Sequence, residues 1–121
     1  MRFRIDSAIV CCTLVLAFVG CASPGEEKYK MTDAELGLTP LAAEGRRVYA
    51  TRCIRCHESY TSKPRAGPSL KGLYHKPFMP SGTPANDDRV AEVTVMGKRM
   101  MPATSLTDEQ MKALLAYLHT L

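Results

Sequence analysis

The chain of 121 residues contains no tryptophan, no internal repeat and no apolar run long enough to cross a bilayer as a helix. Its longest apolar stretch covers residues 8–20, whereas a spanning helix needs about 20 apolar residues. No second cysteine pair follows Cys53 and Cys56 to complete a four-cysteine zinc site. The formal net charge is only +4, with no aromatic residues interleaved among the basic ones. This pattern excludes nucleic acid as a partner.

The N-terminus has the order of features typical of an exported protein. Arg2 and Arg4 precede the apolar stretch, which has the length of a signal-peptide core. We therefore predict a signal peptide in residues 1–20. Its removal takes away two arginines and Asp6, so the mature chain carries a formal charge of about +3.

Cys21 follows this stretch directly, and Phe18-Val19-Gly20-Cys21 resembles a bacterial lipobox. The resemblance implies that Cys21 is lipidated and becomes the mature N-terminus. Cleavage of an ordinary signal near Ala22 or Ser23, or retention of an uncleaved apolar anchor, are the alternatives. The polar residues 21–38 are expected to form a flexible, lipidated tether, and residues 39–121 to form the folded domain.

The pentapeptide Cys53-Ile54-Arg55-Cys56-His57 is the most specific chemical signal in the chain. Cys-x-x-Cys-His is the attachment signature of c-type haem. Residues three apart share one face of a helical turn, so both thiols can reach the same side of a porphyrin. We predict thioether bonds at Cys53 and Cys56, with His57 as the proximal axial ligand of the iron.

Two other interpretations of this cysteine pair fit the sequence less well. A redox dithiol belongs in a βαβ setting, and the sequence shows no such alternation of strands and helices. A zinc site needs four ligands, and Cys53, Cys56 and His57 offer three in an awkward arrangement. Cys11 and Cys12 fall within the predicted signal peptide, so no cysteine remains for a disulfide.

The predicted fold class is all-α, with three main helices and a short turn around one covalently bound haem. Residues with capping propensity precede apolar side chains at helical spacing in three segments: residues 39–52, 86–96 and 107–121. Thr107 and Gln110 have the spacing of a capping box. A short turn is expected at residues 70–74. A domain of this size buries too little apolar surface to be stable without help, and a haem would supply an apolar body for the helices.

Gly45 lies inside the first of these helices, where glycine costs about 1 kcal/mol relative to alanine. A close approach by another helix is the reason we expect for it.

Met101 stands immediately before Pro102-Ala103, and Gly67-Pro68-Ser69-Leu70 follows the haem motif. With these motifs, residues 39–121 resemble a class I monohaem cytochrome c of the bacterial type. The resemblance implies that Met101 is the second axial ligand of the iron, with Met100 as the closest competitor and His75 a further one.

The same resemblance implies contacts away from the iron. The carbonyl of Pro68 is expected to accept a hydrogen bond from His57. Matching positions on the first and last helices imply that these two helices pack across each other: Gly45, Tyr49, Leu114 and Tyr117.

The missing tryptophan is a departure from those relatives in which tryptophan donates a hydrogen bond to a haem propionate. The candidates for that role in this sequence are Tyr74, Lys76, Arg89 and Arg99.

The resemblance implies a one-electron carrier with a single haem c and His/Met ligation, and no enzymatic activity, because the iron has no open position. The alternatives are a haem subunit of a larger oxidoreductase, a haem enzyme, or a sensor with a labile sixth ligand. Basic residues flank both predicted ligands and favour an acidic redox partner, or are simply a solvated surface: Arg52, Arg55, Lys98 and Arg99. We expect a monomer on the periplasmic side of a bacterial membrane, anchored by lipid at Cys21, or alternatively soluble in the periplasm.

Overall fold

The structure is a computed structural model, and it describes residues 24–121. The predicted signal peptide and the lipidation site Cys21 lie outside the described residues. In chain order the elements are α1 (Pro24–Glu27), α2 (Pro40–Arg52), the 3₁₀ helix η1 (Leu73–His75), α3 (Asp87–Met96) and α4 (Asp108–Leu118). The described part contains no strand, only isolated bridges at Phe78 with Pro84 and at Lys98 with Met101. The all-α prediction is confirmed. None of the helices in residues 24–121 is long and apolar enough to cross a membrane.

The three longer helices begin at the capping residues that the sequence suggested. The hydroxyl of Thr39 accepts from the amide of Ala42, with Pro40 in the first turn. Asn86 caps α3 in the same way. Thr107 and Gln110 form the reciprocal capping box of α4. Each helix start is thus stabilised locally, before any tertiary contact is counted.

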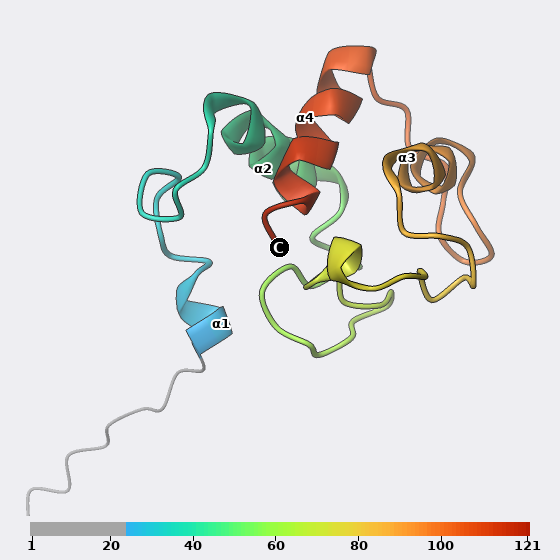
Figure 1. The fold of residues 1–121 in the computed structure, drawn as a ribbon, viewed down its shortest axis with the longest axis horizontal. Coiled ribbons are helices and arrows are strands. Elements are labelled where there is room, and N and C mark those ends of the chain that lie inside the picture. The colour runs from blue at the N-terminus through green and yellow to red at the C-terminus, as the bar shows by residue number, and fades with distance from the viewer. Residues whose placement is uncertain (1–23) are drawn as a thin grey trace, which may run out of the picture.

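Helices α2 and α4 cross at the centre of the molecule (Figure 1), and Gly45 is the point of closest approach. A Cβ atom placed on Gly45 would lie 1.9 Å from the carbonyl oxygen of Ala113 and 2.8 Å from Cβ of Tyr117. The expected reason for a glycine inside this helix is therefore confirmed. Next to the crossing, the rings of Tyr49 and Tyr117 pack with their centroids 5.4 Å apart.

Helix α3 lies to one side of this crossing pair and contacts α4 less extensively than α2 does (Figure 1). Val90 and Thr94 are its buried residues, whereas Val93 is only half-buried. Gly97 ends the helix with a φ of 72°, a conformation in which a side chain would be strained. The chain then turns sharply into the segment that carries Met101.

The N-terminal segment, residues 24–38, differs from the flexible tether expected of it. It forms α1 and a series of turns, and it packs on the domain through half-buried side chains: Tyr29, Leu36 and Leu38. Asp33 holds this segment to α2 through an ion pair with Arg46 at 2.8 Å. The packed unit of the described structure therefore begins well before residue 39.

Candidate haem-binding site

The motif Cys53–His57 forms a turn directly after α2. Cys53 is the C-cap of the helix, and its amide donates to the carbonyl of Tyr49 at 2.8 Å. The amides of Cys56 and His57 both donate to the carbonyl of Cys53 at 3.0 Å, which keeps the turn compact. Both cysteines are free thiols, Cys53 half-buried and Cys56 exposed. Burial raises the pKa of the Cys53 thiol to about 11, partly offset by the positive charge of Arg52.

The imidazole of His57 is buried and held in one orientation. Its Nδ1 lies 2.7 Å from the carbonyl oxygen of Pro68, the contact that the resemblance implied. A carbonyl can only accept, so Nδ1 carries the proton and the lone pair is on Nε2. The backbone at Gly67 lies against the ring, because a Cβ there would be 2.6 Å from Cε1 of His57. The loop therefore fixes the orientation of the ring and engages Nδ1, which leaves Nε2 as the nitrogen for a metal.

The predicted distal ligand lies in a tight turn after α3. Lys98 and Met101 exchange both backbone hydrogen bonds at 3.0 Å, and Arg99 adopts a φ of 53° inside the turn. Met101 is half-buried, whereas Met100 is 92% exposed. Of the two candidates, only Met101 is partly withdrawn from solvent.

The residues present fit a covalently bound haem. Two free thiols and an imidazole with an available Nε2 follow one another in a single turn, which is the donor set of haem c. Half-buried apolar side chains that such a group could pack against come from several segments of the domain: Ile54, Leu70, Met79, Leu106 and Leu115. The described residues contain no group of three or more His, Cys, Asp or Glu side chains arranged to hold a metal ion.

Sequence reasoning missed one cluster beside His57. Glu58 is a buried acid that pairs with Arg65 and accepts a hydrogen bond from Tyr29. Burial alone would raise the pKa of Glu58, but the hydrogen bonds from Tyr29 and Arg65 and the charge of Arg65 together lower it. The aromatic residue Tyr29, in a segment that begins with polar residues, is a sequence signal for this contact.

Residues 40–118 match the model of a family described as Cytochrome C oxidase, cbb3-type, subunit III. The chain belongs to this cytochrome c family. No curated protein matches the chain. Membership implies a haem c cofactor and haem-based electron transfer.

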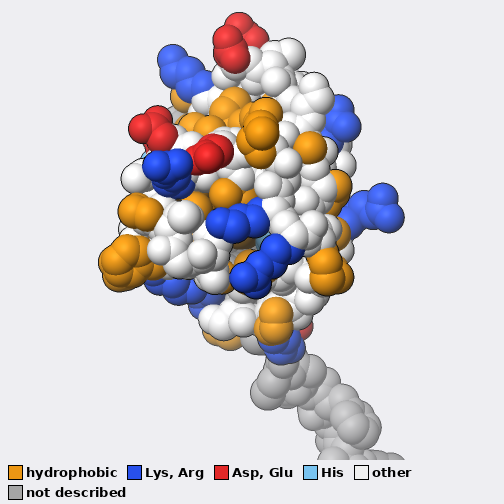
Figure 2. Space-filling view, turned by 90° about the vertical axis from the view of Figure 1, so that its right-hand side faces the viewer, with side chains coloured by type: hydrophobic (Ala, Val, Ile, Leu, Met, Phe, Trp, Pro, Cys, Tyr) orange, Lys and Arg blue, Asp and Glu red, His pale blue; other side chains and the backbone are white. Residues whose placement is uncertain are grey.

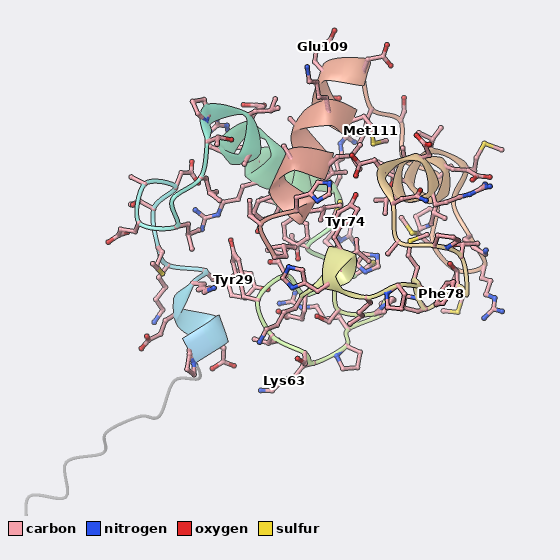
Figure 3. All side chains as sticks on the ribbon, in the orientation of Figure 1. Tyr29, Lys63, Tyr74, Phe78, Glu109 and Met111 are labelled. Carbon is pink, nitrogen blue, oxygen red and sulfur yellow. The ribbon has the colours of Figure 1, made fainter. Side chains whose placement is uncertain are left out.

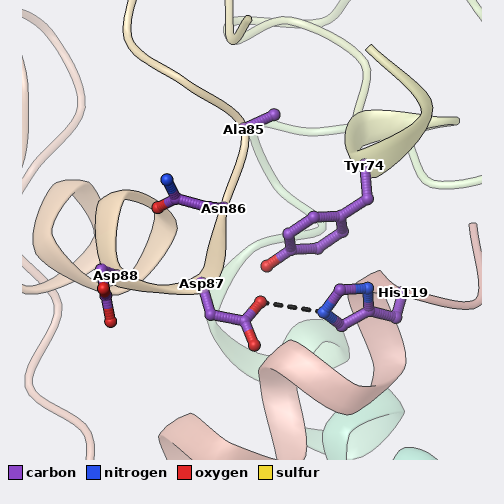
Figure 4. A pocket seen from close by; sticks show the side chains of 6 residues that line it. All are labelled: Tyr74, Ala85, Asn86, Asp87, Asp88 and His119. Carbon is purple, nitrogen blue, oxygen red and sulfur yellow. Dashed lines mark hydrogen bonds and ion pairs between the residues drawn. The ribbon is translucent and has the colours of Figure 1, made fainter. Parts of the chain in front are cut away.

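The cytochrome c domain has a second feature, a pocket of about 410 Å³ between the start of α3 and the end of α4 (Figure 4). The ring of Tyr74 stacks on His119 with centroids 3.7 Å apart, and Nε2 of His119 lies 2.9 Å from a carboxylate oxygen of Asp87. Burial, and then the nearby Asp87, raise the pKa of Tyr74. Of the four candidates for a propionate contact, Arg89 is engaged elsewhere, because it pairs with Glu92 at 2.5 Å.

Replacing tyrosine with phenylalanine should have different effects on stability at two buried hydroxyls of this cytochrome c domain. The hydroxyl of Tyr49 donates to the carbonyl of His57 at 2.5 Å in a buried position, so Tyr49→Phe leaves that carbonyl unpaired and should cost about 1–3 kcal/mol of unfolding free energy. The buried hydroxyl of Tyr74 has no hydrogen-bond partner among residues 24–121, so Tyr74→Phe should leave stability unchanged or raise it. Thermal unfolding of the two holoprotein variants measures the difference. Equal losses would contradict the assignment of these two hydroxyls.

Proposed function

We propose that this chain is a one-electron carrier whose single haem c is attached at Cys53 and Cys56 and bound axially by His57 and Met101. The observation that carries the proposal is the turn at Cys53–His57 with Nδ1 of His57 engaged by Pro68, in a member of a cytochrome c family. When bound, the haem supplies an iron that gains and loses one electron. The protein's part is to hold that iron so that its ligands rearrange little between the two oxidation states.

The two predicted ligands suit that task in different ways. The carbonyl of Pro68 fixes the tautomer of His57 and increases the basicity of Nε2. A thioether sulfur is a soft ligand that favours ferrous iron and raises the potential. With both axial positions filled, no substrate can bind to the iron, so we infer that the protein is not an enzyme.

Exposed basic side chains near the proposed haem site support the proposal that the redox partner is acidic. Lys98 and Arg99 are exposed beside the predicted ligand Met101, and Arg52 and Arg55 are exposed beside the cysteines. Figure 2 shows apolar and basic side chains close together on the face of the molecule at the α3 side. Such a surface would steer an acidic partner, with an association rate that falls as salt rises.

A second candidate function is that of a haem subunit within a larger oxidoreductase. The description of the matching family names an oxidase subunit. The exposed apolar side chains Val95 and Met96 of α3, 47% and 74% exposed, and Met100 in the next turn favour a protein contact in this region. Both candidates use the same haem chemistry and differ in whether the domain dissociates from its partner.

Spectra of the purified holoprotein test the carrier proposal. We expect low-spin c-type bands in the reduced protein, a methionine–iron charge-transfer band in the oxidised protein, and one haem per chain by mass. Rapid carbon monoxide binding at neutral pH would overturn the proposal in favour of an enzyme or sensor. Purification from membranes under mild detergent separates the two candidates, because a subunit would co-purify with an oxidase complex.

We also propose that Cys21 is lipidated and holds the domain on the periplasmic side of a bacterial membrane. The lipobox-like stretch before Cys21 supports this. Labelling with a radioactive fatty acid should mark the wild-type chain and not Cys21→Ala. No label in either chain would leave a soluble periplasmic protein as the better description, and equal labelling of both chains would place the lipid at a residue other than Cys21.

A further inference from the structure

We infer that Tyr29, Glu58 and Arg65 are positioning residues that hold the haem-attachment turn, and that the buried carboxylate of Glu58 keeps the reduction potential low. The inference rests on the proposed function, since it assumes a haem on the turn at Cys53–His57. It concerns residues outside the ligand set. None of them is part of the motifs from which that set was predicted.

Tyr29 ties the N-terminal segment to the three residues that follow His57. Its hydroxyl donates to the carboxylate of Glu58 and accepts from the amide of Ser59 at 3.1 Å and from its hydroxyl at 3.3 Å. Its ring meets Tyr60 edge-on, with centroids 4.9 Å apart. A phenol has one donor and can accept twice, so every hydrogen-bonding position of Tyr29 is used on this loop.

Arg65 closes the cluster from the other side. Its Nε pairs with Glu58, and its Nη1 donates to the carbonyl of Ile54 at 3.1 Å. Ile54 lies between the two cysteines, so one guanidinium links the inside of the attachment turn to the acid after His57. The amide of Arg65 donates to the carbonyl of Gly67 at 3.0 Å, and the amide of Gly67 donates to Cys56 at 2.7 Å. The backbone that orients the imidazole is therefore held by the same residue.

The N-terminal segment is in close contact with this loop. Figure 3 shows Tyr29 between that segment and the loop that carries Lys63. A Cβ on Gly25 would lie 2.5 Å from the carbonyl oxygen of Tyr60, so the two backbones are in close contact. Together with the ion pair from Asp33 to Arg46, this fixes Tyr29 from both ends of the segment.

The charges of the cluster are unequally screened. The side chain of Glu58 is 11% exposed and that of Arg65 is 43% exposed. Solvent screens the guanidinium more than the carboxylate, so Glu58 leaves a net negative field next to His57. A negative charge close to the iron stabilises the oxidised, more positive form. Removal of that charge should therefore raise the potential.

Potentiometric titration with spectra, carried out on full-length holoprotein variants, tests the inference. Glu58→Gln keeps an acceptor for Tyr29 and removes the charge, so we expect an upward shift of the potential. Arg65→Gln leaves the carboxylate uncompensated and should shift the potential downward. Glu58→Asp retains the charge and should restore a potential close to that of the wild type. The matched control is Glu44→Gln, which makes the same charge change at an exposed acid paired with Arg47 on α2.

The positioning role has its own measurement, hydrogen exchange of the holoprotein. Tyr29→Phe keeps the ring contact with Tyr60 and removes the acceptor of the Ser59 amide, so exchange at Ser59 should speed up while the potential changes little. This variant keeps the inference testable if Glu58→Gln gives no holoprotein.

A shift in Glu58→Gln no larger than in Glu44→Gln, or a downward one, overturns the role of the charge. Unchanged exchange in Tyr29→Phe overturns the positioning role. The wild-type spectrum and its response to carbon monoxide decide the proposed function separately, because the comparison between variants needs no particular sixth ligand.

Discussion

Replacing Met101 with alanine should abolish the methionine–iron band of the oxidised protein and lower its reduction potential. Loss of the soft thioether would remove the proposed ligand that favours ferrous iron, and axial ligands set haem potentials over a range of about 0.8 V. We therefore expect the largest shift in potential of any variant that retains the haem. The vacant position should also admit carbon monoxide rapidly. Spectra and a potentiometric titration of the same sample report all three effects.

Met100→Ala is the matched control, because it makes the same chemical change one residue away. Met100 is 92% exposed, whereas Met101 is half-buried and held by paired backbone hydrogen bonds with Lys98. The control should retain the band, the potential and the slow reaction with carbon monoxide. The reverse outcome, with Met100→Ala losing the band, would reassign the ligand to Met100. Loss of the band in neither variant would point to a ligand outside this turn.

The helices could be predicted because their signals are local. Thr39, Asn86 and Thr107 each satisfy a backbone amide within the next three residues, and such capping chemistry is visible in a short window of sequence. Gly45 was interpretable for a different reason. An unfavourable residue in a helix implies a compensating contact, although the sequence alone did not identify Ala113 as the residue in that contact.

The packing of residues 24–38 was not predicted, because it depends on contacts with residues distant in the sequence. Pro, Gly and charged residues at its start are typical of a linker, and nothing in the local pattern shows that Tyr29 meets Glu58, 29 residues away. The same limit applies to the site. The turn at Cys53–His57 is a contiguous motif, whereas the pairing of Glu58 with Arg65 depends on how the following loop folds back.

Gly45→Ala should destabilise the holoprotein, although local propensity alone predicts the opposite. Within a helix, alanine is favoured over glycine by about 1 kcal/mol. The added Cβ would lie 1.9 Å from the carbonyl oxygen of Ala113, so α2 and α4 would have to move apart. Overpacking of this kind costs about 1–3 kcal/mol and sometimes more, and we expect a net loss near the upper end because the opposing atoms are backbone.

Thermal unfolding followed at the haem band measures this loss, and about 3 kcal/mol corresponds to a fall in Tm of roughly 12–24 °C for a domain of this size. Ala50→Gly on the exposed face of α2 is the control, since it measures the propensity effect alone and should cost about 1 kcal/mol. A higher Tm in Gly45→Ala would mean that α2 and α4 are not in contact at this position. The fold would then depend far less on their crossing, and the attachment turn at the end of α2 would be held mainly by the cluster of Tyr29, Glu58 and Arg65.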